Sequence, residues 1–84
     1  MMFQVAERNG DYIVEAYIIE DPNSTRGYWH PLRNFGCRQA DAFAFRDWDC
    51  PKLTDGQLRI LVKNYGSLSL GRAGLAGYPP GFLR

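Results

Sequence analysis

The chain has 84 residues, of which 45% are hydrophobic and 23% are charged, and its formal net charge is +1. This length allows one domain with a thin core, and the composition is that of a globular protein rather than a disordered one. The small net charge argues against a dedicated binder of nucleic-acid backbones. No apolar run approaches the roughly 20 residues of a membrane-spanning helix, and no secretory signal is recognisable, so a cytoplasmic location is expected.

The N-terminal segment VAERNGDYIVEAYI carries the clearest local signal, an Asn-Gly pair between two apolar runs. Asn9 and Gly10 predict a two-residue type I′ hairpin turn, because both turn positions need a positive φ. The turn sets the register, with Arg8 opposite Asp11. Alternation then assigns one face of the hairpin to the core: Phe3, Val5, Val14, Ala16 and Ile18. The opposite face is too apolar for solvent and too polar for a deep core: Gln4, Ala6, Ile13, Glu15, Tyr17 and Ile19.

A loop and a third, irregular strand are expected next. The composition of residues 21–27, DPNSTRG, is typical of a loop. The following segment, YWHPLRNF, has the aromatic and apolar character of a strand, but Pro31 cannot donate to a sheet. Pro31 therefore predicts an edge strand or a bend, and the hairpin becomes a sheet of two to three strands.

Two short helices are expected after Gly36. The first runs from about Arg38 to Trp48, and its buried stripe is predicted to be Ala40, Phe43 and Ala44. It is followed by a second helix that has better-marked ends.

The second helix is expected to begin after Thr54, which forms a capping box with Gln57. Leu53 and Leu58 occupy the positions of a hydrophobic staple, and Gly66 is placed as a C-terminal cap. One face is predicted to be apolar and buried, and Ile60 points away from it. That face consists of Leu58, Leu61, Val62 and Tyr65.

These elements predict one α+β domain, residues 1–66, in which an N-terminal antiparallel hairpin precedes two short helices. An irregular tail with several glycines and prolines, residues 67–84, completes the chain. Its large apolar side chains favour packing back onto the domain. The alternative is a docking arm for a partner, in which Arg72 and Arg84 supply cations to a segment without acids.

Catalysis and metal binding find little support. The spacing of Cys37 and Cys50 matches no zinc or redox motif, so free thiols are expected, with no cofactor and no metal. A small cysteine-dependent enzyme remains an alternative if Cys37, His30 and an acid such as Asp47 or Asp49 meet in space.

Binding to a larger protein or protein complex is the favoured function. Aromatic residues and arginine dominate binding hot spots, and aromatic residues make up 14% of this chain. The pattern is of the type seen in small phage or mobile-element proteins, such as host-defence inhibitors, that block a larger machine. The alternative is a nucleic-acid-binding module that uses Arg26, Tyr28, Trp29 and Arg33. The predicted anchors for a protein partner are Tyr17, Tyr28, Trp29, Phe45, Trp48, Arg72 and Arg84.

Overall fold

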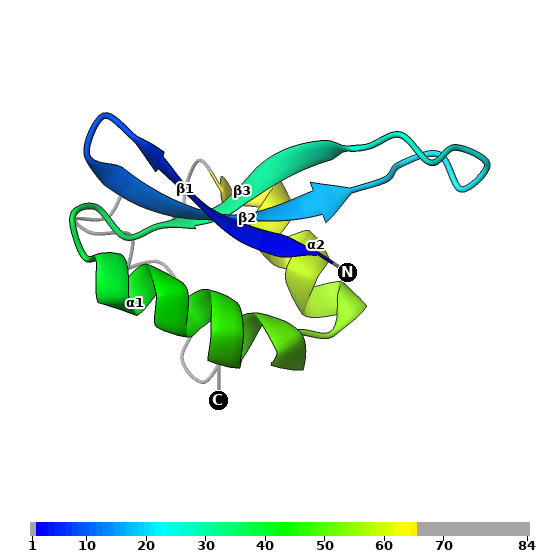
Figure 1. The fold of residues 1–84 in the computed structure, drawn as a ribbon. Coiled ribbons are helices and arrows are strands. Elements are labelled where there is room, and N and C mark those ends of the chain that lie inside the picture. Colours follow the sequence, from blue (N-terminus) through cyan, green and yellow to red (C-terminus); the bar gives the residue numbers. More distant parts are fainter. Residues whose placement is uncertain (1, 66–84) are drawn as a thin grey trace.

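A three-stranded antiparallel sheet forms the first part of the structure, a computed structural model that describes residues 2–65. Its strands are β1 (Phe3–Arg8), β2 (Asp11–Ile18) and β3 (Tyr28–Asn34), in the spatial order β1-β2-β3. Figure 1 shows both helices beneath one face of this sheet. The α+β class with an N-terminal hairpin is therefore confirmed. The predicted tail, with Arg72 and Arg84, lies outside the described residues.

The hairpin turn has the predicted geometry. Asn9 has a φ of 54° and Gly10 a φ of 85°, the positive values that the two central positions of a type I′ turn require. The register follows from the turn and runs as predicted, from the pair Arg8–Asp11 to the pair Phe3–Ala16. Local turn chemistry therefore decides which side chains of β1 and β2 share a face of the sheet.

β3 is an edge strand, and its irregularity lies at Pro31. The register between β2 and β3 shifts between Val14 and Glu15, where Val14 pairs with Arg33 and Glu15 pairs with Pro31. Leu32 is the additional residue of this bulge, and its side chain is fully buried. An edge position suits a proline, because no outer strand requires its missing N–H.

The helical segment after the sheet is longer and less regular than expected. α1 (Gln39–Ala44) continues into a turn of π-helix, η1 (Phe45–Asp49), and then into a 3₁₀ turn, η2 (Cys50–Lys52). After Leu53 the chain enters α2 (Asp55–Lys63).

The predicted buried stripe of the first helix is wrong. Ala42 and Phe45 are buried, whereas Ala40, Phe43 and Ala44 are exposed. Apolar residues fill every position from 42 to 45, so helical spacing fits two stripes equally well. Packing decides between them, because the Phe45 ring lies 5.4 Å from the ring of Phe35.

The core lies between the sheet and the helices. Side chains from β2, β3, α1, η1, η2 and α2 meet there, and the predicted core face of the hairpin supplies part of it. Arg33 also lies on this side, with its guanidinium 4.6 Å from the Phe35 ring centre and 5.4 Å from that of Phe45. The buried members of the cluster are Val14, Ala16, Leu32, Phe35, Ala42, Phe45, Cys50, Leu58 and Leu61.

α2 begins as the sequence predicts. The Gln57 backbone N–H donates to the Thr54 hydroxyl oxygen at 3.1 Å, and the Thr54 N–H donates to the Gln57 side-chain oxygen at 2.9 Å. Leu58 is buried, Leu53 packs against the core, and Ile60 points into solvent. The helix ends at Lys63, and the predicted cap at Gly66 lies outside the described residues.

We expect Thr54→Ala to destabilise the protein by about 1 kcal/mol, because the change leaves the Gln57 N–H without its acceptor. The midpoint of urea denaturation measures this loss. Thr25→Ala is the matched control, because Thr25 is an exposed threonine in the loop between β2 and β3. Equal midpoints for the two variants would contradict a stabilising cap at Thr54.

Candidate functional site

The ends of β2 and β3 and the loop between them form an arm, residues 17–29, that projects beyond both helices (Figure 1). Tyr17 and Trp29 pair across the two strands at its base, with ring centres 5.3 Å apart in an edge-to-face arrangement. The Gly27 N–H donates to the Tyr17 hydroxyl at 2.9 Å. The two predicted anchors therefore lie together at the base of the arm, where the ring contact and this hydrogen bond hold them.

Tyr17 and Trp29 lie on the sheet face opposite the helices, and a buried carboxylate lies beside them. Glu15 is 2% exposed. It accepts a hydrogen bond from the Gln4 amide at 2.7 Å and forms an ion pair with Arg8 at 2.6 Å. A buried charge is costly unless it is paired, and these two partners offset the cost of burying the Glu15 carboxylate. The face therefore combines an aromatic pair with a satisfied polar group.

Tyr28 points to the other side of the sheet from Trp29, since neighbouring residues of a strand face opposite ways. It is 41% exposed, and its hydroxyl donates to Glu20 at 3.3 Å. Partial desolvation and, secondarily, the Glu20 carboxylate raise the pKa of Tyr28. Its ring lies 6.0 Å from His30, which in turn lies 6.3 Å from Tyr65 of the segment after α2.

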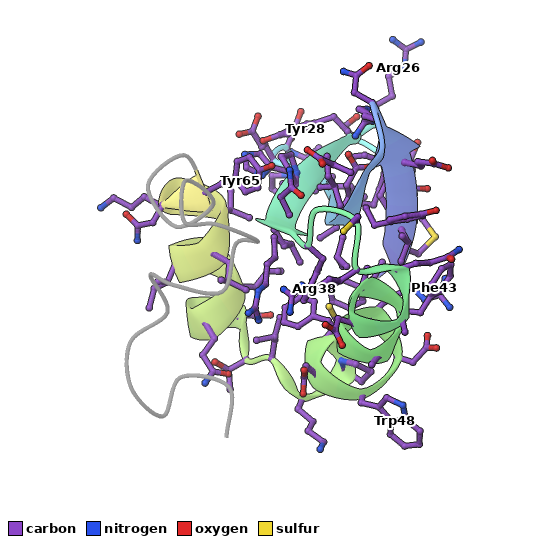
Figure 2. The ribbon with its side chains drawn as sticks, turned by 90° about the vertical axis from the view of Figure 1, so that its left-hand side faces the viewer. Arg26, Tyr28, Arg38, Phe43, Trp48 and Tyr65 are labelled. Carbon is purple, nitrogen blue, oxygen red and sulfur yellow. The ribbon has the colours of Figure 1, made fainter. Side chains whose placement is uncertain are left out.

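Two further predicted anchors, Phe45 and Trp48, have opposite environments. Phe45 is only 2% exposed and belongs to the core, so it cannot contact a partner without unfolding; this prediction needs correction. Trp48 is 69% exposed. Figure 2 shows Trp48 pointing away from the domain at the end opposite Tyr28. Trp48 therefore cannot share one small interface with Tyr28.

The predicted nucleic-acid constellation does not form one surface. Arg33 is buried against the rings of Phe35 and Phe45, whereas Arg26 lies at the tip of the arm (Figure 2). Tyr28 and Trp29 face opposite sides of the sheet. A stacking platform needs aromatic rings and cations side by side, and these four residues do not provide it.

A groove lies between the base of the arm and α2, with a volume of about 330 Å³. Ile18, Leu58 and Val62 supply apolar walls. Its other lining residues are Tyr17, Ile19, Asp55, Arg59 and Lys63. Sequence reasoning did not find this groove, although the apolar stripe of α2 and the Ile-Ile pair at the end of β2 were visible signals.

Two of the residues considered for cysteine chemistry, His30 and Asp47, have contacts with other groups. His30 places Nδ1 2.8 Å from the Pro31 carbonyl oxygen, and Asp47 pairs with Arg46 at 2.8 Å. That hydrogen bond with Arg46 lowers the pKa of Asp47. Cys37 is exposed and Cys50 is buried, and both are free. Within residues 2–65, no three His, Cys, Asp or Glu side chains cluster as metal ligands.

Burial raises the pKa of the Cys50 thiol from 9.0 to about 12, with the nearby Asp49 carboxylate adding to the effect. The folded state thus favours the neutral thiol. As the pH rises above about 9, the unfolded state loses this proton while the folded state keeps it. The contribution of Cys50 to the free energy of unfolding is therefore fully present below pH 9.0, and it is lost progressively as the pH rises to about 12.

We expect iodoacetamide at about pH 8 to modify Cys37 and to spare Cys50 until denaturant is added, since alkylation requires an accessible thiolate. Mass spectrometry of the folded and unfolded protein counts the modified thiols. Cys50→Ala should also lose less stability than the wild type between neutral and alkaline pH. Rapid modification of both cysteines in the folded protein would contradict the buried environment of Cys50.

Comparisons with known protein families, curated proteins and solved structures find no match. None of the helices in residues 2–65 combines the length and the apolar character that crossing a membrane requires.

Proposed function

We propose that this protein is a small non-enzymatic binding module, an inhibitor or accessory subunit that covers a surface on a larger protein. The observation that supports it best is the contact of Tyr17 with Trp29 on the sheet face opposite the helices. Tyrosine and tryptophan are enriched among the residues that dominate binding energy. Here they are also held in place, which reduces the entropy lost on binding.

The surroundings of this pair favour a protein over a nucleic acid. Ile13 and Pro31 lie on the same face as Tyr17 and Trp29; Ile13 is buried, and the partly exposed Pro31 adds apolar surface beside the two rings. The Glu15 carboxylate on this face is paired with Arg8, and Glu20 lies farther out on the arm. An apolar centre with a polar rim is typical of protein interfaces, whereas a phosphate backbone needs a cationic surface.

The test is capture of a partner from extracts of the native host by the tagged full-length chain. Trp29→Ala should weaken binding of the captured protein at least about tenfold, which corresponds to roughly 1.4 kcal/mol. Trp48→Ala is the matched control, because it removes a more exposed tryptophan from another surface. Trp29→Tyr keeps a ring beside Tyr17 and should retain part of the affinity.

Circular dichroism and the melting temperature must show that each variant is folded before affinities are compared. Unchanged affinity in folded Trp29→Ala would contradict the proposed surface. A loss confined to Trp48→Ala would move the interface to the helical end of the molecule. Capture of nucleic acid alone, weakened steeply by salt, would favour the nucleic-acid alternative.

A further inference from the structure

The groove between the base of the arm and α2 has an apolar floor at the margin of the core, formed by Ile18, Leu58 and Val62. Leu58 is buried, and Ile18 and Val62 are partly buried at its walls. Ile19, the residue directly after β2, is 47% exposed. Its volume of about 330 Å³ is at the lower end of ligand sites, about 300–1,000 Å³. Such a groove admits a few side chains of a peptide segment.

The rim of the groove is cationic along α2. Arg59 and Lys63 are exposed and lie one helical turn apart, so their side chains are neighbours on one face. Within residues 2–65, neither forms an ion pair with an acidic side chain. Asp55 lies one turn closer to the start of α2, and Glu20 and Asp21 do not line the groove.

From the apolar floor and this rim, we propose that the groove binds a segment of a partner protein in which apolar and acidic side chains alternate. Apolar side chains enter between Ile18, Leu58 and Val62, while two carboxylates meet Arg59 and Lys63. Residues i and i+2 of an extended segment lie about 6.6 Å apart on one side, which matches side chains one helical turn apart. The proposal rests on the proposed binding function and specifies the chemistry of the segment that the partner offers.

Charge distinguishes this occupant from two others. Residues 67–84 of the same chain contain no acid and carry Arg72 and Arg84, so they would place like charges beside the cationic rim. A nucleic acid would match the two cations but would leave the apolar floor unfilled. An acidic and apolar protein segment satisfies both parts of the groove.

Short synthetic peptides with alternating leucine and glutamate, added to the full-length protein, test this proposal. The matched probes carry lysine in place of each glutamate. Fluorescence anisotropy should show affinity for the acidic peptides at least about tenfold higher than for the lysine peptides, and added salt should reduce the difference. In NMR spectra, the amide signals of Ile18, Ile19, Leu58 and Val62 should shift on binding.

Charge reversal provides the decisive variants. Lys63→Glu and Arg59→Glu should each weaken binding of the acidic peptides, and the double variant should prefer the lysine peptides. Lys52→Glu is the matched control, because Lys52 is an exposed cation outside the groove. It makes the same change in net charge and should leave the affinity unchanged.

Several results would overturn the proposal. These are equal binding of acidic and lysine peptides, an equal effect of Lys52→Glu, tighter binding of an oligothymidylate, and contacts of residues 66–84 or of a second copy with the groove in the free protein. Because the peptides are added directly, this result does not depend on Trp29. Loss of partner capture in Trp29→Ala with intact peptide binding would support both sites, and intact capture there would contradict only the sheet-face interface.

Discussion

Phe45→Ala is expected to destabilise the protein by about 3–5 kcal/mol, because it leaves a cavity in the centre of the core. Phe45 is 2% exposed, and its ring contacts that of Phe35 at 5.4 Å and supports the Arg33 guanidinium at 5.4 Å. Removing the ring therefore removes apolar contacts and one side of the environment of a buried cation. A small domain has a total stability of about 5 kcal/mol, so a loss of this size is severe.

Denaturation with urea, followed by circular dichroism, measures this effect. Trp48→Ala is the control, since it removes a larger ring only three positions later but from a side chain that is 69% exposed. That change should alter stability by no more than about 0.5 kcal/mol. Phe45→Leu, which keeps an apolar side chain, should lose about 1–2 kcal/mol and remain measurable if Phe45→Ala does not fold. Similar losses in Phe45→Ala and Trp48→Ala would contradict the observed orientation of the first helix.

Gly27→Ala should destabilise the arm by about 2 kcal/mol or more, because no side chain fits at this position. A Cβ on Gly27 would overlap the carbonyl oxygen of Ile18 and come within 2.9 Å of Cε2 of Tyr17. The Ile18 contact involves backbone, which cannot move aside as the end of a flexible side chain could. The change would also displace the Gly27 N–H from the Tyr17 hydroxyl, which it now meets at 2.9 Å.

Gly56→Ala is the matched control for this substitution. Gly56 lies in the first turn of α2, and a Cβ added there would have the Thr54 hydroxyl oxygen as its nearest neighbour, 3.9 Å away. Alanine is a better helix former than glycine, so Gly56→Ala should stabilise the protein by about 0.5 kcal/mol.

Tryptophan fluorescence should report a local change at Trp29 in the Gly27 variant. A wild-type denaturation midpoint for Gly27→Ala would contradict the close packing of the arm.

Much of the fold could be predicted from the sequence where a few neighbouring residues decide the geometry. Asn9 and Gly10 dictate a turn with two positive φ angles, and the turn then dictates the register of β1 and β2. Thr54 and Gln57 mark the start of α2 through hydrogen bonds that span only one helical turn. Pro31 indicates an edge strand because it lacks a donor.

The orientation of the first helix could not be predicted in this way. Two overlapping apolar stripes compete in residues 40–45, and their periodicity does not distinguish them. Tertiary contacts show which stripe faces the core, among them the contact of Phe45 with Phe35, ten residues away. Arg33 is a similar case, because its guanidinium lies over the rings of Phe35 and Phe45. Phe45 belongs to η1, so the sequence neighbours of Arg33 do not reveal this environment.

The sequence by itself identified the aromatic residues that are candidates for binding. Only the tertiary structure decided how these residues are grouped. Strand pairing brings Tyr17 to Trp29, whereas Tyr28 faces the other side of the sheet and Phe45 enters the core. The groove beside α2 likewise needs the end of β2 and the helix to meet, though 37 positions separate Ile18 from Asp55. Turns and caps depend on short-range hydrogen bonds, while surfaces and grooves arise where distant segments pack together, and packing selects among patterns that the local sequence permits equally.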